Sequence, residues 1–387
     1  MNKGNEQMND PKKARWAITL FFIISGFGYF SWASRIPDIQ QKLSLNDAEL
    51  GSVLLALPVG LMLTLPVTGA LLQRFSSRSI MFAGALAFNL MLSLIGFANE
   101  TWQLVLILFA FGSSRNLLNI SMNGNSVGVQ ALYDRSIITT FHGIWSVAGF
   151  SAVGFGALMI YFKIGPSWHF LGVGLAMVLL GFYAFPGSLK QPPAPTGRKG
   201  FALPDKTLVK YGLISFGSMS CEGTMIDWSG IYFQKAVHVS DNWVGVGFFA
   251  YTVMMAAGRF GGDKLVNRWG AAPMIRYSGI LLFCGLLLAA LLPYPVTASL
   301  GFMMAGLGVS CVVPLVFALG GKASKMSNGA SIAAISTVGY FGFLLVPPAV
   351  GFLAEAIGLR WTFAIVSCFG VLIAVLVSQL KEEPATT

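Results

Sequence analysis

The chain has 387 residues, of which 55% are apolar and only 10% are charged, and its formal net charge is +10. Soluble domains carry about 25% charged residues, so a soluble globule is excluded because it could not cover its surface. The basic residues stand in small groups between long apolar runs and form no basic stripe with interleaved aromatics, which argues against nucleic-acid binding. The composition indicates a polytopic membrane protein.

Twelve apolar stretches follow one another along the chain, each close to the roughly 20 residues that cross about 30 Å of hydrocarbon. They cover residues 15–37, 47–71, 79–98, 102–130, 138–162, 168–186, 207–234, 243–262, 273–292, 296–319, 329–354 and 360–380. The first stretch is too long for the core of a signal peptide, so we expect it to remain as a spanning helix. The predicted fold class is an all-α polytopic membrane protein with twelve transmembrane helices.

One connection is longer than the others. Residues 187–206, "GSLKQPPAPTGRKGFALPDK", are rich in Pro, Gly and Lys and contain no apolar period. They divide the predicted helices into two sets of six. We therefore predict an N-terminal six-helix bundle over residues 1–186, a cytoplasmic linker over 187–206 and a C-terminal six-helix bundle over 207–387.

The basic residues indicate an orientation. If both termini are cytoplasmic, the inside segments hold 19 of the 25 basic residues. The other six are Arg35, Lys42, Lys163, Lys235 and Arg360 outside, and Arg115 within a span. Because cytoplasmic loops carry an excess of Lys and Arg, we predict that both termini lie in the cytoplasm.

An internal repeat appears when the chain is shifted against itself by about 193 residues. The shift aligns "QQK" (40–42) with "FQK" (233–235), "GALLQRFSSRS" (69–79) with "GGDKLVNRWGA" (261–271), and Gly149-Phe150 with Gly342-Phe343. The linker falls between the two copies. Two six-helix halves related by a parallel repeat are the architecture of one class of transporters.

The two aligned loops resemble the helix 2–3 loop of the major facilitator superfamily, with its pattern Gly-x-Leu-x-Asp-Arg-x-Gly followed by basic residues. In the first copy Gly69, Leu71, Arg74 and Arg78 match, and in the second Leu265, Arg268 and Gly270 match. Gln73 and Asn267 stand at the acidic position, while "GRFGGDK" before the second loop keeps Arg259 and Asp263. The resemblance implies gating roles for Arg74, Arg259, Asp263 and Arg268.

Longer stretches resemble the fucose-permease-like bacterial branch of that superfamily. They are "SWASRIPDIQ", "ISMNGNSVGV", "FHGIWSVAGF", "CEGTMIDWSGIYF" and "GYFGFLLVPPAVGFLAE", in spans one, four, five, seven and eleven. The resemblance implies a pseudo-symmetric twelve-helix fold in the bacterial inner (plasma) membrane. It also implies alternating-access transport of a small solute, often a sugar and often with protons. Where fucose permease has acids in spans one and four, this chain has only Asp38, at the outer end of span one, and Asn119.

Span four carries an unusual polar stripe. At 100° per residue, Arg115, Asn116, Asn119 and Asn123 fall within about a 100° arc of one helix. A charge at this depth costs several kcal/mol, about 3 on insertion scales, unless it faces protein or water. Two interpretations stay open: a static polar seam between helices, or a cavity wall that offers hydrogen-bond donors to a polar solute. The aligned span ten has no such stripe, which favours binding.

Aromatic residues in the motif segments are candidates to stack against a solute. They are Tyr29, Trp32, Trp145, Trp228 and Tyr340. Interfacial belts explain most tryptophans in membrane proteins, so a purely structural role is the alternative for each of them.

Acidic residues within spans are scarce. Glu222 lies near the middle of span seven, and apolar surroundings favour the protonated form of a carboxyl group, so Glu222 is the candidate proton carrier. The alternative is a structural ion pair with Arg115. His142, near the cytoplasmic start of span five, is a second candidate for proton transfer, or an interface residue. Arg35 and Asp227 are candidates for a contact that closes the outer face, or for a static bridge.

We therefore expect a secondary active transporter for a small polar solute, a sugar or sugar-like molecule, with proton symport. The alternative is proton-coupled efflux of amphipathic drugs or metabolites. An enzyme is not expected, because three scattered His and four Cys without a CxxC or Cys/His cluster supply neither a catalytic set nor a metal site. No cofactor, metal or nucleic-acid partner is expected, and the expected state is a monomer in the bilayer.

Overall fold

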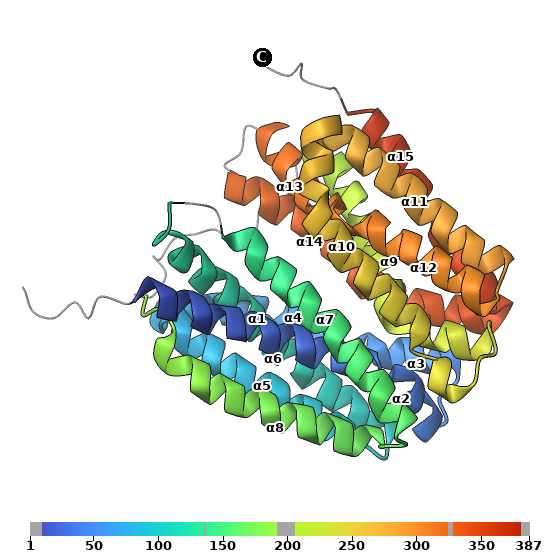
Figure 1. Cartoon of the computed structure of the whole chain (residues 1–387), viewed down its shortest axis with the longest axis horizontal. Coiled ribbons are helices and arrows are strands. Elements are labelled where there is room, and N and C mark those ends of the chain that lie inside the picture. Colours follow the sequence, from blue (N-terminus) through green and yellow to red (C-terminus); the bar gives the residue numbers. More distant parts are fainter. Residues whose placement is uncertain (1–9, 135–136, 192–205, 324–327, 381–387) are drawn as a thin grey trace, which may run out of the picture. The chain divides into compact units, whose positions relative to one another are not determined.

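A computed structural model describes residues 10–134, 137–191, 206–323 and 328–380. Within these ranges the chain is helical and contains no strand (Figure 1). The α-helices are α1 (Pro11–Ala33), α2 (Ile36–Lys42), α3 (Asp47–Leu54), α4 (Ala56–Arg74), α5 (Ser77–Ile95), α6 (Thr101–Gln130), α7 (Ile138–Tyr161), α8 (Pro166–Ala184), α9 (Lys206–Lys235), α10 (Val246–Trp269), α11 (Ala271–Leu291), α12 (Pro295–Ser310), α13 (Val312–Ala323), α14 (Asn328–Ile357) and α15 (Leu359–Ser378). Two short 3₁₀ helices, η1 (Phe185–Gly187) and η2 (Asp241–Trp243), stand between them.

Eleven segments among the described residues are long and apolar enough to cross a membrane. All eleven match predicted spans one by one, with α3 and α4 forming one span, α8 and η1 another, and α12 and α13 a third. The remaining predicted span is α9, which has 30 residues but includes Lys210, Glu222 and Asp227. Its length suffices for a crossing, and its polar residues explain its lower hydropathy. The chain is therefore an all-α polytopic membrane protein with twelve spans.

Three of the predicted continuous spans are interrupted. Helices α1, α3 and α12 end at Ala33, Leu54 and Ser310, and each ends four residues before a proline, Pro37, Pro58 and Pro314. Proline has no N–H, so the last carbonyl of each helix loses its usual helical partner and the helix breaks there. The sequence therefore contains the cause of all three breaks.

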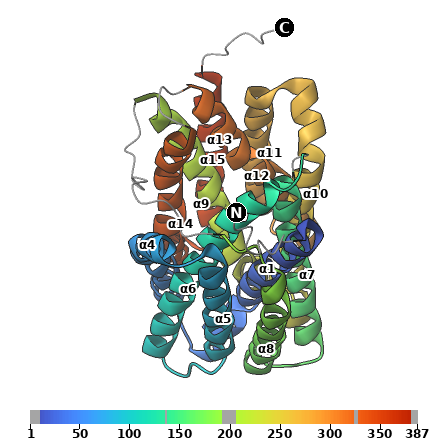
Figure 2. The ribbon, with the colours of Figure 1, turned by 90° about the vertical axis from the view of Figure 1, so that its left-hand side faces the viewer.

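The chain divides into two compact units. Unit 1 holds Met1–Trp32, Ala56–Ala152 and Pro166–Arg198, so it contains most of α1 and α7 together with α4, α5, α6 and α8. Within it α5 packs against α6 and α8, and α4 packs against α6 (Figure 2). This arrangement buries the face of α6 that bears Leu104, Leu108, Phe111 and Leu118.

Unit 2 holds Ala33–Leu55, Val153–Gly165 and Lys199–Thr387, and so includes α2, α3 and α9 to α15. Within it α11 packs against α12 and α15, α10 packs against α12, and α9 packs against α14 (Figure 1). The pairs α10–α12, α11–α12 and α11–α15 repeat the pairs α4–α6, α5–α6 and α5–α8 of unit 1 in the same chain order. The helices therefore repeat one packing scheme, as the aligned sequence motifs predict.

The predicted boundaries of the two six-helix bundles depend on the linker over residues 187–206. Most of the linker, residues 192–205, lies outside the described part of the chain. The predicted division at residues 187–206 stays a prediction.

Candidate functional site

The guanidinium of Arg115 lies on the face of an aromatic ring. Its Cζ atom is 3.7 Å from the centroid of the Tyr29 ring, which α1 contributes. Tyr29 is 5% exposed, and its ring is held edge-on by Phe30 at 5.6 Å between centroids. The Arg115 Nε atom is buried and has no hydrogen-bond partner among the described residues. A guanidinium on a ring face is a cation–π contact, which is stronger when the pair is shielded from water.

Amide side chains continue this face of α6 towards its C-terminal end. Asn119 Oδ1 accepts a hydrogen bond from Ser25 Oγ of α1 at 3.0 Å. One turn further, Asn123 is exposed and donates to the backbone carbonyl of Asn119 at 2.9 Å. The row of Arg115, Asn119 and Asn123 thus runs from half-buried to exposed positions.

Asn116 of the predicted stripe, and Asn125 outside it, bond to other helices of unit 1. Asn116 is 3% exposed, and its Nδ2 donates to Thr68 Oγ1 of α4 at 2.9 Å. Asn125 is fully buried and donates to Ser77 Oγ and to the carbonyl of Leu189. Asn116 therefore bonds within unit 1 as the static-seam interpretation expects. The interpretation of Arg115, Asn119 and Asn123 as a cavity wall stays a prediction.

The other predicted aromatic residues lie in different surroundings. Trp32 is 1% exposed and packs near Phe170, with 6.3 Å between ring centroids. Trp145 of α7 meets Phe30 edge-on at 5.1 Å and is half-buried. Through Phe30, Trp145 and Tyr29 belong to one aromatic group in unit 1. In unit 2, Tyr340 of α14 is 40% exposed and Trp228 of α9 is fully buried.

Glu222 has a basic partner on the neighbouring helix. Its Oε1 lies 3.6 Å from Arg259 Nη2, which joins α9 to α10 within unit 2. Their side chains are 12% and 23% exposed, so the pair is largely shielded. At 3.6 Å this contact is an ion pair without a good hydrogen bond. Arg259, predicted as a gating residue, therefore lies beside the predicted proton carrier.

His142 lies near the start of α7 and is exposed. Its ring meets Phe22 of α1 edge-on, with 5.4 Å between centroids. The role of His142 in proton transfer stays a prediction.

Arg35 of the predicted outer gate binds a carboxylate close in sequence. Its Nε and Nη2 atoms donate to the two oxygens of Asp38, each at 2.9 Å, and Nη2 also donates to the carbonyl of Ile164 at 3.0 Å. Burial raises the pKa of the Asp38 carboxyl above its ordinary value of 3.8, although the Arg35 guanidinium acts in the opposite direction. The proposed contact between Arg35 and Asp227 stays a prediction.

A polar network at the predicted outer ends of the helices was not predicted from the sequence. Asp47 Oδ1 accepts hydrogen bonds from Lys235 Nζ at 2.6 Å and from Gln40 Nε2 at 2.8 Å. The Asp47 amide donates to Glu355 Oε2 at 3.1 Å, so α3, α9 and α14 are joined within unit 2. The available signal was the position of Asp47 and Lys235 at the same predicted side of the membrane, one at the start of span two and one after span seven.

Beside this network is an open cavity of about 700 Å³. Polar residues that line it include Asp47, Lys235, His238, Tyr294 and Arg360. Arg360 is held by the carbonyls of Ala290 and Leu291. None of the predicted solute-binding residues lines this cavity.

The remaining predicted gating residues lie towards the ends of their helices. Arg74 and Arg268 are exposed in the last turns of α4 and α10. Asp263 lies in α10, and its side chain is outside the part of the chain that the structure describes. The gating roles of these residues stay predictions.

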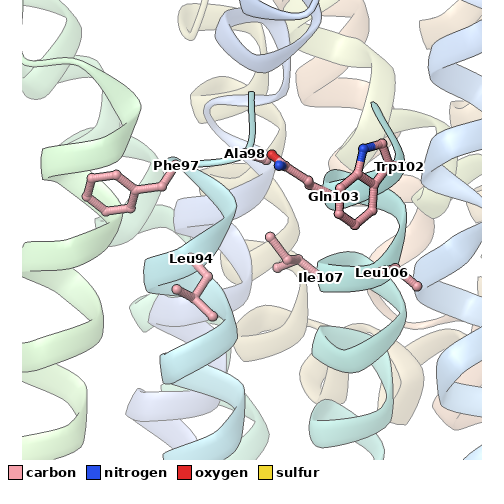
Figure 3. Close-up of a pocket in the computed structure, with 7 residues that line it drawn as sticks. All are labelled: Leu94, Phe97, Ala98, Trp102, Gln103, Leu106 and Ile107. Carbon is pink, nitrogen blue, oxygen red and sulfur yellow. The ribbon is translucent and has the colours of Figure 1, made fainter. Parts of the chain in front are cut away.

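A second pocket lies in unit 1, where α5 ends and α6 begins. It has a volume of about 310 Å³ and is lined by Leu94, Phe97, Ala98, Trp102, Gln103, Leu106 and Ile107 (Figure 3). No charged side chain lines it, and Trp102 and Leu106 are 63% and 59% exposed. Such a surface suits contact with acyl chains, since tryptophan is typical of membrane interfaces. Among the described residues there is also no group of three His, Cys, Asp or Glu that could hold a metal ion.

Twelve membrane-spanning helices with one packing scheme repeated in the chain, and a few charged and amide side chains within the spans, define a membrane transport protein. The chain belongs to the Major Facilitator Superfamily, whose family model matches residues 17–344. It is therefore a secondary carrier, a protein that binds a small-molecule substrate within the membrane.

Similar proteins agree with this assignment. The chain is 29% identical over 348 residues to an uncharacterized MFS-type transporter of Yersinia pestis, covering 90% of this chain and 91% of the relative. It is 30% identical over 366 residues to an uncharacterized transporter of Sinorhizobium fredii, covering 93% and 96%. A bacterial homolog of the human lysosomal transporter Spinster, in an inward-facing and occupied conformation, superposes with a TM-score of 0.75 at 15% identity, covering 97% of both chains. This last likeness concerns the fold alone.

Proposed function

We propose that this protein moves a small polar solute, a sugar or sugar-like molecule, across the bacterial inner membrane by alternating access and proton symport. The observation that carries the solute assignment is the group of Arg115, Tyr29, Asn119 and Ser25 on α6 and α1. An arginine within a span is costly unless it has a function or a partner, and polar residues at this depth mark solute pathways. An aromatic ring beside donor groups suits a hydroxylated solute.

The proton assignment is supported by the pair of Glu222 and Arg259. A proton on Glu222 would remove the negative charge that holds the Arg259 guanidinium, so protonation and the arrangement of α9 and α10 would be linked. At 3.6 Å, the contact between Glu222 Oε1 and Arg259 Nη2 is longer than a good hydrogen bond. A switch of this kind needs a local change of charge and an element with two arrangements, and in the proposal the contact between α9 and α10 is that element.

The solute is tested first by ligand screening. We would measure the thermal stability of the purified full-length protein against neutral sugars, sugar acids and amphipathic drugs, since a bound ligand raises the unfolding temperature. Polar hits are the expected result. A screen that returns amphipathic compounds alone would contradict the proposal and favour efflux.

Proton coupling is tested with any hit in proteoliposomes, with and without a pH gradient. We expect Glu222→Gln to abolish gradient-driven accumulation while it leaves solute exchange across the membrane without a gradient. Glu100→Gln is the matched control, because Glu100 stands at the start of α6 outside the predicted spans and the same change is conservative there. Accumulation that persists in Glu222→Gln would show that another group carries the proton.

A further inference from the structure

Unit 1 has an uncompensated positive charge within the membrane. Its only acidic residues are Glu6, Asp10, Glu100 and Asp134, and all four lie outside the predicted spans. At 1.5 Å per residue, Glu100 is about 22 Å from Arg115 along the axis of α6. Among the described residues Arg115 forms no ion pair. Its guanidinium makes a cation–π contact with the ring of Tyr29. Unit 1 by itself cannot neutralise this charge.

The acids of unit 2 that lie near basic groups already have cationic partners. Glu222 pairs with Arg259, Asp38 pairs with Arg35 and Asp47 pairs with Lys235. From the sequence, a pair between Glu222 and Arg115 was an open alternative. Because one carboxylate carries one negative charge, Glu222 cannot compensate Arg259 and Arg115 together.

Arg115 and Asn119 present hydrogen-bond donors. Asn119 uses its Oδ1 to accept from Ser25, so the donor that it can offer to a ligand is its Nδ2 group. The buried Arg115 Nε has no partner among the described residues. A site that presents a cation and donors is complemented by a ligand that brings acceptors and a negative charge.

The ring of Tyr29 does not replace such a ligand. A cation–π contact stabilises a guanidinium but brings no negative charge, so the cost of a charged arginine within the bilayer is not fully offset. The ring lies 3.7 Å from the Arg115 Cζ atom, and the buried Nε has no hydrogen-bond partner among the described residues, so a donor remains for a ligand. Arginine and carboxylate form paired hydrogen bonds with defined geometry.

We propose that the transported solute is an anion, and that its carboxylate binds the guanidinium of Arg115 while the ring of Tyr29 contacts the same guanidinium and Asn119 donates a further hydrogen bond. This inference rests on the proposed function, because it takes the group around Arg115 as the solute site. It narrows the solute from polar molecules in general to hydroxylated carboxylic acids, such as aldonic and uronic acids. Arg115 is then the residue that determines specificity for charge.

The test compares sugar acids with neutral analogues of similar size. Binding of glucuronate and glucuronamide, and of galacturonate and galactose, would be measured on the purified full-length protein in lipid nanodiscs at one ionic strength. We expect the wild-type protein to bind at least one acid ten-fold or more tightly than its neutral partner. Because this comparison needs no variant, it stands even if substitutions at Arg115 prevent folding. A panel in which no acid is preferred overturns the inference.

Three variants locate the preference. Arg115→Gln is expected to lose the preference for acids, and Arg115→Lys is expected to keep the preference with weaker binding, since the charge remains without the fork. The matched control is Arg78→Gln, because Arg78 also stacks on a ring in unit 1, that of Phe185 at 4.2 Å, but at the start of α5. The control is expected to keep the preference for acids.

The outcomes separate the inference from the proposed function. If a neutral sugar binds as tightly as its acid and Arg115→Gln loses both, the solute site stands and the anion inference is wrong. If an acid is preferred equally by wild type and Arg115→Gln, the charge is recognised elsewhere and the inference is wrong. If ligands bind normally to both Arg115→Gln and Tyr29→Leu, the proposed solute site itself is wrong.

Discussion

Tyr29 is the side chain in direct contact with the charge of α6, and its contribution can be measured separately from its bulk. We expect Tyr29→Leu to weaken solute binding about ten-fold, because a cation–π contact of about 1 to 2 kcal/mol is lost. Tyr29→Phe is the matched control, since it keeps the ring face 3.7 Å from Arg115 Cζ and is expected to bind nearly as well. Equal losses in both variants would show that the hydroxyl, and not the ring face, recognises the solute.

Asp38 provides a prediction about pH. Burial raises the pKa of its carboxyl above 3.8, so folding favours the protonated form. The stability that this group contributes is therefore complete below its ordinary pKa and is lost as the pH rises through the raised pKa. We expect Asp38→Asn, which keeps a carbonyl acceptor for Arg35, to show a smaller loss of thermal stability than the wild type between pH 4 and pH 7.

The control for this experiment is Asp10→Asn, because Asp10 is exposed and an asparagine can keep its hydrogen bond to the amide of Lys12. This variant should follow the wild-type pH dependence. If Asp38→Asn loses more stability than the wild type on raising the pH, then the charge of Arg35 outweighs the burial of the carboxyl.

The charged residues of the site could be identified from the sequence, but their contacts could not. Arg115 and Glu222 stand out because a charge within an apolar run is rare and costly. Their partners Tyr29 and Arg259 lie on other helices, 86 and 37 positions away, and helical periodicity states only which face a residue occupies. For this reason the sequence left Arg115 with two possible partners, whereas the structure pairs Glu222 with Arg259.

Among the helices, the close approach of α4 to α6 supports the site. A Cβ atom on Gly112 would collide with the backbone carbonyl of Leu57, so this glycine permits close packing. We expect Gly112→Ala to lower the unfolding temperature clearly, by the several degrees that correspond to about 1 to 3 kcal/mol of overpacking. The measurement is thermal unfolding of the purified protein in detergent.

Gly124 on the same helix is the matched control. A Cβ atom there has no neighbour within 4 Å, and alanine favours a helix over glycine by about 0.5 to 1 kcal/mol. Gly124→Ala should therefore leave stability unchanged or raise it slightly. A similar loss of stability in both variants would mean that the α4–α6 contact is not as tight as described.

Most helices could be predicted from the sequence because twenty apolar residues in a membrane have few alternatives to a helix. The predicted spans 102–130 and 138–162 agree closely with α6 (Thr101–Gln130) and α7 (Ile138–Tyr161). The breaks before Pro37, Pro58 and Pro314 were not predicted, since apolar periodicity does not register a missing N–H. The network around Asp47 was also missed, because it depends on packing among α3, α9 and α14.

Helix packing identifies the fold of the protein, whereas the basic residues of its loops indicate its orientation in the membrane. The helices of a transporter can be recognised without knowing which end faces the cytoplasm, because packing is independent of the side on which the loops lie. Orientation depends on the basic residues of the loops, and a single inversion of the chain would place 19 of the 25 basic residues outside. The positive-inside rule makes that inversion unfavourable, so the sequence carries the stronger argument on this point.

The orientation can be tested with reporter fusions to the full chain and to truncated chains. We expect green fluorescent protein to be fluorescent after Thr387 and within residues 192–205, since both segments are predicted to be cytoplasmic. Alkaline phosphatase, which is active only outside the cytoplasm, is expected to be active when fused after Lys163, between α7 and α8. The reverse pattern would contradict the predicted orientation and would place the Asp47–Lys235 network at the cytoplasmic side.

A double variant tests whether the basic residues of many loops together cause this orientation. Replacing Arg74 and Arg78 with Gln removes two basic residues from one inside loop. Because the bias is shared among many loops, we expect the orientation to persist.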